Sequence, residues 1–182
     1  WVNSIYMHIP YRETDVSQAI LPQKCERRAF VHIGYAQVSK KDPIDKYGHL
    51  GPVIAAARLE KTVENLIVHN ATGYMAYSEG IYEDVNRAIL AGLSSRQYLN
   101  SDKVIDKYVR RYFDAGNSGV QDWTHWLKKW DAPFNVEPGE ASRDFAKFNV
   151  KKSENWRLRQ WQLKTELFQL HRQIGNGAEW TT

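Results

Sequence analysis

The sequence predicts an α/β fold in its first half and an all-helical region in its second half. Up to about residue 95, β-prone runs alternate with segments of helical periodicity, and this alternation is the signature of parallel βαβ units. Beyond that point only helical periodicity remains. Hydrophobic residues make up 42% of the 182 residues and charged residues 25%, which is typical of globular chains with a core and excludes intrinsic disorder.

The first half is expected to hold three strands and two helices. Pro52 favours the first turn of the first helix, because its fixed φ suits that position. Apolar residues then recur at helical spacing from Val53 to Ile67. The run from Thr72 to Ser78 is short and β-prone, so we expect a buried parallel strand there. The expected strands are 2–9, 29–38 and 72–78, and the expected helices are about 51–70 and 82–93.

The second half is expected to hold four helices, at about 101–115, 118–132, 138–148 and 153–174. Trp123, Trp126 and Trp130 fall on one face of the second of these, a spacing that favours a place in the core. The last helix has apolar residues on two faces, so we expect it to be packed on both sides. One face carries Trp156, Leu163, Leu167, Leu170 and Ile174, and the other carries Leu158, Trp161 and Phe168.

The number of strands bears on domain organisation. Three parallel strands cannot close a sheet, and an eight-stranded βα barrel needs about 250 residues. Residues 1–95 are therefore interpreted as the last βα units of a larger α/β domain, and residues 96–182 as a helical C-terminal region. The remainder of the parent polypeptide is then the expected partner. The alternative is a small, self-contained α+β domain.

Composition and motifs exclude several function classes. The formal charge is only +4, and basic side chains alternate with apolar ones along the helices as on solvated faces, so no nucleic-acid partner is predicted. No apolar run approaches the roughly 18 residues of a membrane span. The six histidines show no HExxH pattern, and phosphate-binding and dinucleotide-binding glycine motifs are missing, so no metal and no cofactor are predicted.

Candidate ligand-binding residues follow the expected strands, because α/β folds bind ligands beyond the carboxyl ends of their strands. Three segments qualify: 11–15, 37–47 and 77–84. The third is the most informative, since Glu79 lies at the strand end and Gly80 allows a sharp turn. Tyr77 and Tyr82 flank this carboxylate with ring faces. A carboxylate beside aromatic rings indicates carbohydrate chemistry.

Glycoside hydrolysis ordinarily requires two carboxyl groups. Glu79 is one candidate, and its partner is Glu13, Asp15 or an acid outside this sequence. The competing interpretation is that Glu79 only stabilises the N-terminus of the following helix. Further candidates for substrate contact are Tyr11, His8 and His32, and for the two histidines a structural hydrogen bond is the alternative.

Two motifs resemble a known group of proteins. Residues 73–87, GYMAYSEGIYEDVNR, resemble the end of the barrel in uncharacterised bacterial glycoside hydrolase-like proteins, where a strand ends in a Ser-Glu-Gly turn before an Asp-x-Asn helix. Tyr-x-x-x-Tyr-Phe at 108–113 resembles the start of the helical region that follows such barrels. The resemblance implies a (β/α)8 catalytic domain, a carbohydrate substrate and a bacterial protein that is commonly secreted or periplasmic.

The resulting hypothesis is the C-terminal part of a (β/α)8-type barrel followed by an α-helical region, acting on carbohydrate by carboxylate acid/base chemistry. Such a chain would be incomplete as an enzyme on its own, because about five strands of the barrel are missing. The alternative is a non-enzymatic helical protein-interaction module whose aromatic residues form its core.

Overall fold

The computed structural model describes residues 2–9, 20–33, 54–78, 84–131, 136–148 and 155–174. The chain divides into two compact units. Unit 1 comprises residues 1–37 and 55–105, and unit 2 comprises residues 38–54 and 106–182.

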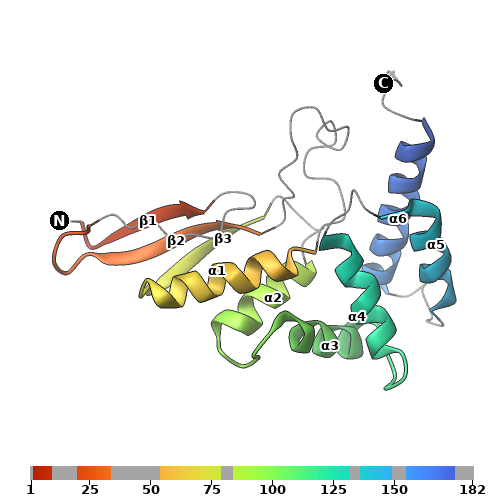
Figure 1. Ribbon diagram of the computed structural model, residues 1–182, viewed down its shortest axis with the longest axis horizontal. Coiled ribbons are helices and arrows are strands. Elements are labelled where there is room, and N and C mark those ends of the chain that lie inside the picture. The colour runs from red at the N-terminus through yellow and green to blue at the C-terminus, as the bar shows by residue number, and fades with distance from the viewer. Residues whose placement is uncertain are drawn as a thin grey trace. The chain divides into compact units, whose positions relative to one another are not determined.

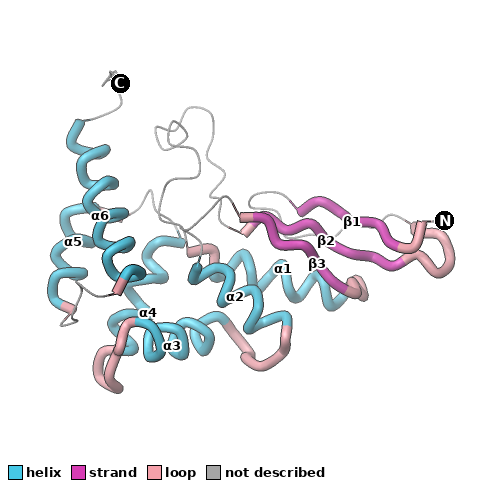
Figure 2. The backbone as a smooth tube through the Cα atoms, turned by 180° about the vertical axis from the view of Figure 1, so that it is seen from behind, coloured by secondary structure: helices cyan, strands magenta, loops and turns pink. Residues whose placement is uncertain are grey.

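Unit 1 is built on a parallel sheet with strand order β1-β2-β3 (Figure 1). The strands are β1 (Ser4–Ile9), β2 (Glu26–His32) and β3 (Gly73–Tyr77). His8 lies opposite Phe30, and His32 lies opposite Tyr77. The helices α1 (Ala56–Val68) and α2 (Asp84–Ser94) lie on one face of this sheet (Figure 2).

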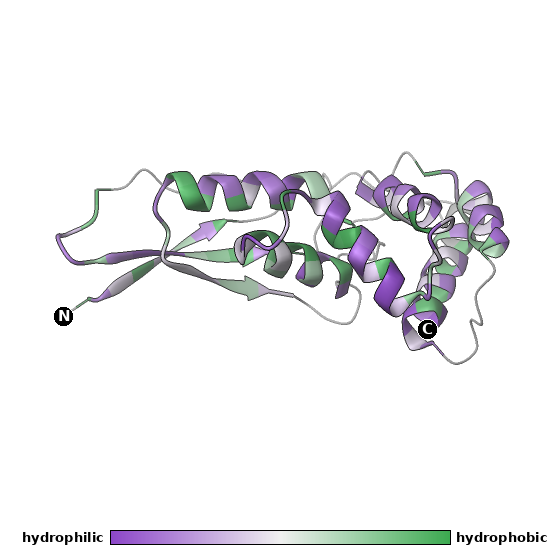
Figure 3. Cartoon of the chain, turned by 90° about the horizontal axis from the view of Figure 1, so that it is seen from below, coloured by the Kyte–Doolittle hydropathy of each residue, from purple (hydrophilic) through white to green (hydrophobic). Residues whose placement is uncertain are grey.

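The core of unit 1 lies between the sheet and these two helices. Met7, Ile9, Ala29 and Val31 are buried, and they alternate along their strands with residues of the opposite face, as the period of a strand requires. Figure 3 shows hydrophobic and hydrophilic residues interspersed along the helices, as expected when one helical face packs and the other meets water. The buried helix residues include Leu59, Val63, Leu66, Ile89, Leu90 and Leu93.

Unit 2 contains the helices of the C-terminal half. The boundary between the units falls within α3 (Ser101–Tyr112), which is followed by α4 (Val120–Lys128), a 3₁₀ turn at Lys129–Asp131, α5 (Pro138–Lys147) and α6 (Trp156–Ile174). The sequence predicted these four helices, and they are confirmed.

An aromatic cluster forms the core of unit 2. Trp123, Trp126 and Trp130 are at most 2% exposed, which confirms their predicted place in the core. The ring of Trp126 lies 5.3 Å from both Phe145 and Trp161, centroid to centroid. Its indole N–H donates to the carbonyl of Ala141 at 3.1 Å, so the one polar atom of the side chain is satisfied. This cluster joins α4, α5 and α6.

The expectation that this chain is the C-terminal part of a (β/α)8-type barrel is wrong. In the described residues the structure is a small α/β protein with three parallel strands and six helices, and no barrel is present. β1 and β3 each pair only with β2 there, so the sheet is open, with two edges. A barrel requires the last strand to pair with the first.

Three finer expectations are also corrected. The second strand begins at Glu26 rather than Ala29, because pairing with β1 extends over the charged residues 26–28. The third strand is parallel, as predicted, but it is not buried, since it is an edge strand among the described residues and Tyr77 is 38% exposed. Within the described part of the chain, the last helix packs on one face and not on the other: Trp161 is 2% exposed and Leu163 is 47% exposed.

Among the helices of the described ranges, none is both long enough and apolar enough to cross a membrane.

Candidate functional site

Three of the predicted contact residues lie at the carboxyl end of the sheet. His8 is the penultimate residue of β1, and His32 and Tyr77 are the last residues of β2 and β3. Parallel strands end at the same edge, so these three side chains come from adjacent strand ends. The strand register places them all on the face of the sheet opposite to α1 and α2.

The rings of these residues meet. His8 Nε2 lies 2.7 Å from His32 Nε2. The His32 and Tyr77 rings are 5.1 Å apart, centroid to centroid. Phe30 completes the group, because its ring lies 5.8 Å from His8, 5.4 Å from His32 and 5.7 Å from Tyr77. We call His8, Phe30, His32 and Tyr77 the ring cluster.

The two histidines form one hydrogen-bonded pair. At 2.7 Å one imidazole nitrogen donates its N–H and the other accepts it, with the direction set by the tautomer of each ring. His32 is buried at 8% exposure, whereas His8 is exposed. Arg58 of α1 donates to the carbonyl of His32 at 2.7 Å and thereby ties the end of β2 to the helical layer. The ring cluster is therefore anchored to α1 through the end of β2, and its exposed members are His8 and Tyr77.

Phe30 was not singled out by the sequence as a site residue. It lies two residues before His32 in the same strand, so the alternation of a strand places both on one face. That spacing is the signal that identifies it once the strand is known.

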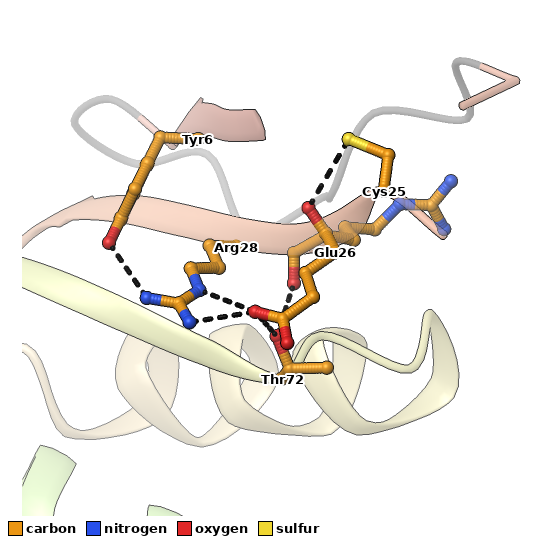
Figure 4. A network of polar contacts seen from close by, with 6 residues as sticks. Tyr6, Cys25, Glu26, Arg28 and Thr72 are labelled. Carbon is orange, nitrogen blue, oxygen red and sulfur yellow. Dashed lines mark hydrogen bonds and ion pairs between the residues drawn. The ribbon is translucent and has the colours of Figure 1, made fainter. Parts of the chain in front are cut away.

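A polar network lies on the same face, closer to the amino ends of the strands (Figure 4). Arg28 donates to the Tyr6 hydroxyl at 3.2 Å and to the Glu26 carboxylate at 2.7 Å. The hydrogen bond to Tyr6 and those to Glu26 raise the pKa of Arg28, and the hydrogen bonds from Arg28 lower the pKa of Glu26. The Thr72 hydroxyl also donates to Glu26, at 3.4 Å. These groups are exposed, so they orient one another and add little stability.

A cavity of about 640 Å³ lies elsewhere in unit 1, at the amino end of β3. It is lined by the last turns of α1 and α2 and by the start of β3. The Tyr74 hydroxyl in its wall is hydrogen-bonded to Ser94 Oγ at 2.8 Å, and Ser94 in turn donates to the carbonyl of Leu90. Its hydroxyl groups thus bond within the fold, and the cavity lies away from the strand ends where α/β folds bind ligands.

Unit 2 has a hollow of about 350 Å³ whose lining includes Lys129, Asp144 and Lys147. These charges pair with one another: Lys129 Nζ lies 3.1 Å from Asp144 and Lys147 Nζ lies 2.8 Å from it. Burial lowers the pKa of Lys129, but hydrogen bonds to Asp144 and Glu140 outweigh burial and raise it overall. Because the lysines and Asp144 neutralise one another, this hollow is weakly suited to binding a charged ligand.

The described residues do not include five predicted site residues: Glu79, Glu13, Asp15, Tyr82 and Tyr11. Their roles stay predictions. In the sequence Glu79 follows Tyr77, the last residue of β3, by two positions. Across the described ranges, no three His, Cys, Asp or Glu side chains are grouped as a metal ion requires.

Comparison with protein-family models, curated proteins and solved structures gives no match. The resemblance of residues 73–113 to glycoside hydrolase-like proteins therefore has no support from these comparisons, and the ring cluster is the main guide to function.

Proposed function

We propose that the protein binds carbohydrate on the ring cluster at the carboxyl ends of β1, β2 and β3. The observation that carries the proposal is the convergence of four rings from adjacent strands, with His8 Nε2 and His32 Nε2 2.7 Å apart among them. Sugar rings have an apolar C–H face and a rim of hydroxyl groups. Aromatic rings pack against the C–H face of a sugar, and imidazole nitrogens form hydrogen bonds with its hydroxyl groups.

The exposure pattern supports a ligand at this position. Tyr77 at 38% and the exposed His8 present ring surface outward, while the largely buried His32 holds the arrangement in place. Exposed aromatic rings are otherwise costly to leave in water, and clusters of them mark binding surfaces.

Hydrolysis is the second part of the proposal. It requires a proton donor and a second carboxylate. We assign these roles to Glu79, which follows β3 in the sequence, and to Glu13, which follows β1. Histidines of the ring cluster would then contact sugar hydroxyl groups rather than take part in bond cleavage.

The binding test uses isothermal titration with a panel of oligosaccharides. Tyr77→Ala and His8→Ala should each weaken binding by about tenfold, the worth of one ring contact. Trp156→Ala is the matched control, because Trp156 is also exposed, at 54%, and belongs to unit 2. Unchanged affinity in both ring-cluster variants, or no binding by any oligosaccharide, would show that the proposed site is wrong.

Glu79→Gln separates binding from hydrolysis. The amide keeps the shape of the side chain and removes the acid, so we expect sugar binding to persist and release of reducing ends to stop. Hydrolysis at the wild-type rate in this variant would contradict a catalytic role for Glu79 and would favour the alternative, in which Glu79 only stabilises the N-terminus of the following helix.

A further inference from the structure

The sheet face that carries the ring cluster continues, with exposed side chains, towards the amino ends of the strands. Tyr6 is 44% exposed and Met75 is 51% exposed. Each stands two residues before a member of the ring cluster in its own strand, so the alternation of a strand places it on the same face. α1 and α2 pack on the opposite face (Figure 2). The ring cluster is therefore one end of a longer accessible strip.

Tyr6, Glu26 and Arg28 form the other end of this strip (Figure 4). Arg28 donates to Glu26 Oε2 from Nη2 at 2.7 Å and from Nε at 3.0 Å, and to the Tyr6 hydroxyl from Nη1 at 3.2 Å. A guanidinium has five N–H groups, so two remain for a ligand. The hydrogen bonds to the Glu26 side chain end on Oε2, which leaves Oε1 as an acceptor. Fixed donors and acceptors therefore stand side by side on an accessible surface.

Gly73 leaves an open position beside Arg28. The two residues lie opposite each other in the pairing of β2 with β3, and so on the same face of the sheet. A Cβ built on Gly73 would meet no heavy atom within 4 Å. The φ of Gly73 lies outside the left-handed region, so the strand itself does not require glycine. The missing side chain leaves a floor beside the guanidinium on which a sugar ring can lie.

The length and the charge of the strip restrict its ligand. Arg28 and His32 are four residues apart on β2, which is about 13 Å at 3.3 Å per residue of a parallel strand. A single sugar ring does not span this distance, whereas an extended oligosaccharide does. Arg28 and Glu26 form an ion pair and neutralise each other, so the strip favours sugar hydroxyl groups over a charged group of either sign.

We propose that the ligand of the ring cluster is an extended, neutral oligosaccharide that continues along β2 to a second subsite. This subsite consists of Tyr6, Glu26, Arg28 and Gly73, and we call it the Arg28 subsite. One sugar ring lies over Gly73, and its hydroxyl groups bond to the remaining N–H groups of Arg28 and to Glu26 Oε1. Phe30, between the two subsites on β2, supplies an apolar contact. This inference rests on the proposed binding of carbohydrate at the ring cluster.

The probes are cello-oligosaccharides and chito-oligosaccharides, from the monosaccharide to the hexasaccharide. Both series are neutral and extended, so a hexasaccharide reaches both subsites and a disaccharide reaches only one. In isothermal titration with the full chain, the hexasaccharide of the series that binds should bind at least about tenfold more tightly than its disaccharide. We call this difference the length gain.

Two variants assign the length gain to the Arg28 subsite. Arg28→Ala removes the donors, and Gly73→Thr fills the open floor with a residue that favours strands. Each should remove most of the length gain. The matched controls should keep it: Arg143→Ala changes an exposed arginine of α5, and Ala76→Thr changes a residue on the other face of β3. Circular dichroism checks that each variant keeps its fold.

The outcomes separate this inference from the proposed function. An affinity that does not depend on chain length would overturn the Arg28 subsite and leave carbohydrate binding at the ring cluster in place. A length gain that persists in both Arg28→Ala and Gly73→Thr would do the same. No binding by any oligosaccharide would overturn the proposed function of the ring cluster and the Arg28 subsite with it.

Discussion

Asn86 is a polar residue that is completely buried in unit 1. Its side-chain oxygen accepts the backbone N–H of Ala55 at 2.9 Å, directly before α1 begins. The first amides of a helix lack partners within the helix, and a buried one must find an acceptor elsewhere. The asparagine of the Asp-x-Asn pattern thus holds α1 and α2 together.

Asp144 offers a test by pH. Hydrogen bonds from Lys147 and Lys129 hold the pKa of Asp144 below its usual range. A carboxyl whose pKa is lower in the folded protein stabilises the fold above its unfolded pKa, and that contribution is lost as the pH falls through the folded pKa. Asp144→Asn should therefore lower the free energy of unfolding at pH 7 by less than about 1 kcal/mol, since the pair is partly solvated.

Urea melts at pH 7 and at pH 3 check this expectation. The difference between variant and wild type should shrink below about pH 4, where unfolded aspartate becomes protonated. High salt at pH 7 should also reduce the stability difference between the variant and the wild type. A difference of the same size at both pH values would contradict the assigned cause.

At the scale of elements, Gly92 sets the packing of α2 against α3. A Cβ built there would lie 2.8 Å from Val104 Cγ2 and 3.1 Å from Tyr98 Cδ2. Alanine favours a helix over glycine by about 1 kcal/mol, but the clash with a branched side chain exceeds that gain. We expect Gly92→Ala to destabilise the protein by about 1–2 kcal/mol in urea melts.

Gly139 of α5 is the matched control. A Cβ there would meet only the flexible end of Arg143, at 3.4 Å. Gly139→Ala should therefore leave stability unchanged or raise it by a few tenths of a kcal/mol. If both substitutions stabilise the protein, the close contact between α2 and α3 does not require glycine at position 92.

At the scale of the whole molecule, each unit has its own core, and in unit 2 several helices share an aromatic core. Trp126 joins three helices and is 2% exposed. Trp126→Ala removes a large buried side chain and leaves a cavity, so it should cost about 3–5 kcal/mol. Trp156→Ala removes the same side chain from an exposed position, at 54%, and should cost less than about 1 kcal/mol. Guanidinium melts that do not distinguish the two variants would exclude Trp126 from the core.

The helices and the parallel strands were readable from the sequence because their signals are local. Periodicity, helix-starting proline and β-prone runs act over a few residues, and they located α3 to α6 and the strand Gly73–Tyr77. Of the candidate site, Tyr77 followed from the rule that ligands bind at strand ends, whereas His8 and His32 were chosen as histidines within expected strands. Their contact with one another, and the place of Phe30 among them, required the register of three strands.

The open sheet and the exposed face of α6 could not be predicted from the sequence, because they depend on packing between residues far apart in the chain. Strand-like runs look the same in a barrel and in an open sheet, since only pairing between distant strands tells the two apart. The two apolar faces of α6 are equally apolar in the sequence, yet one packs on Trp126 and Trp130 while the other is exposed. Local patterns show which residues share a face, and the arrangement of the layers determines which face is covered.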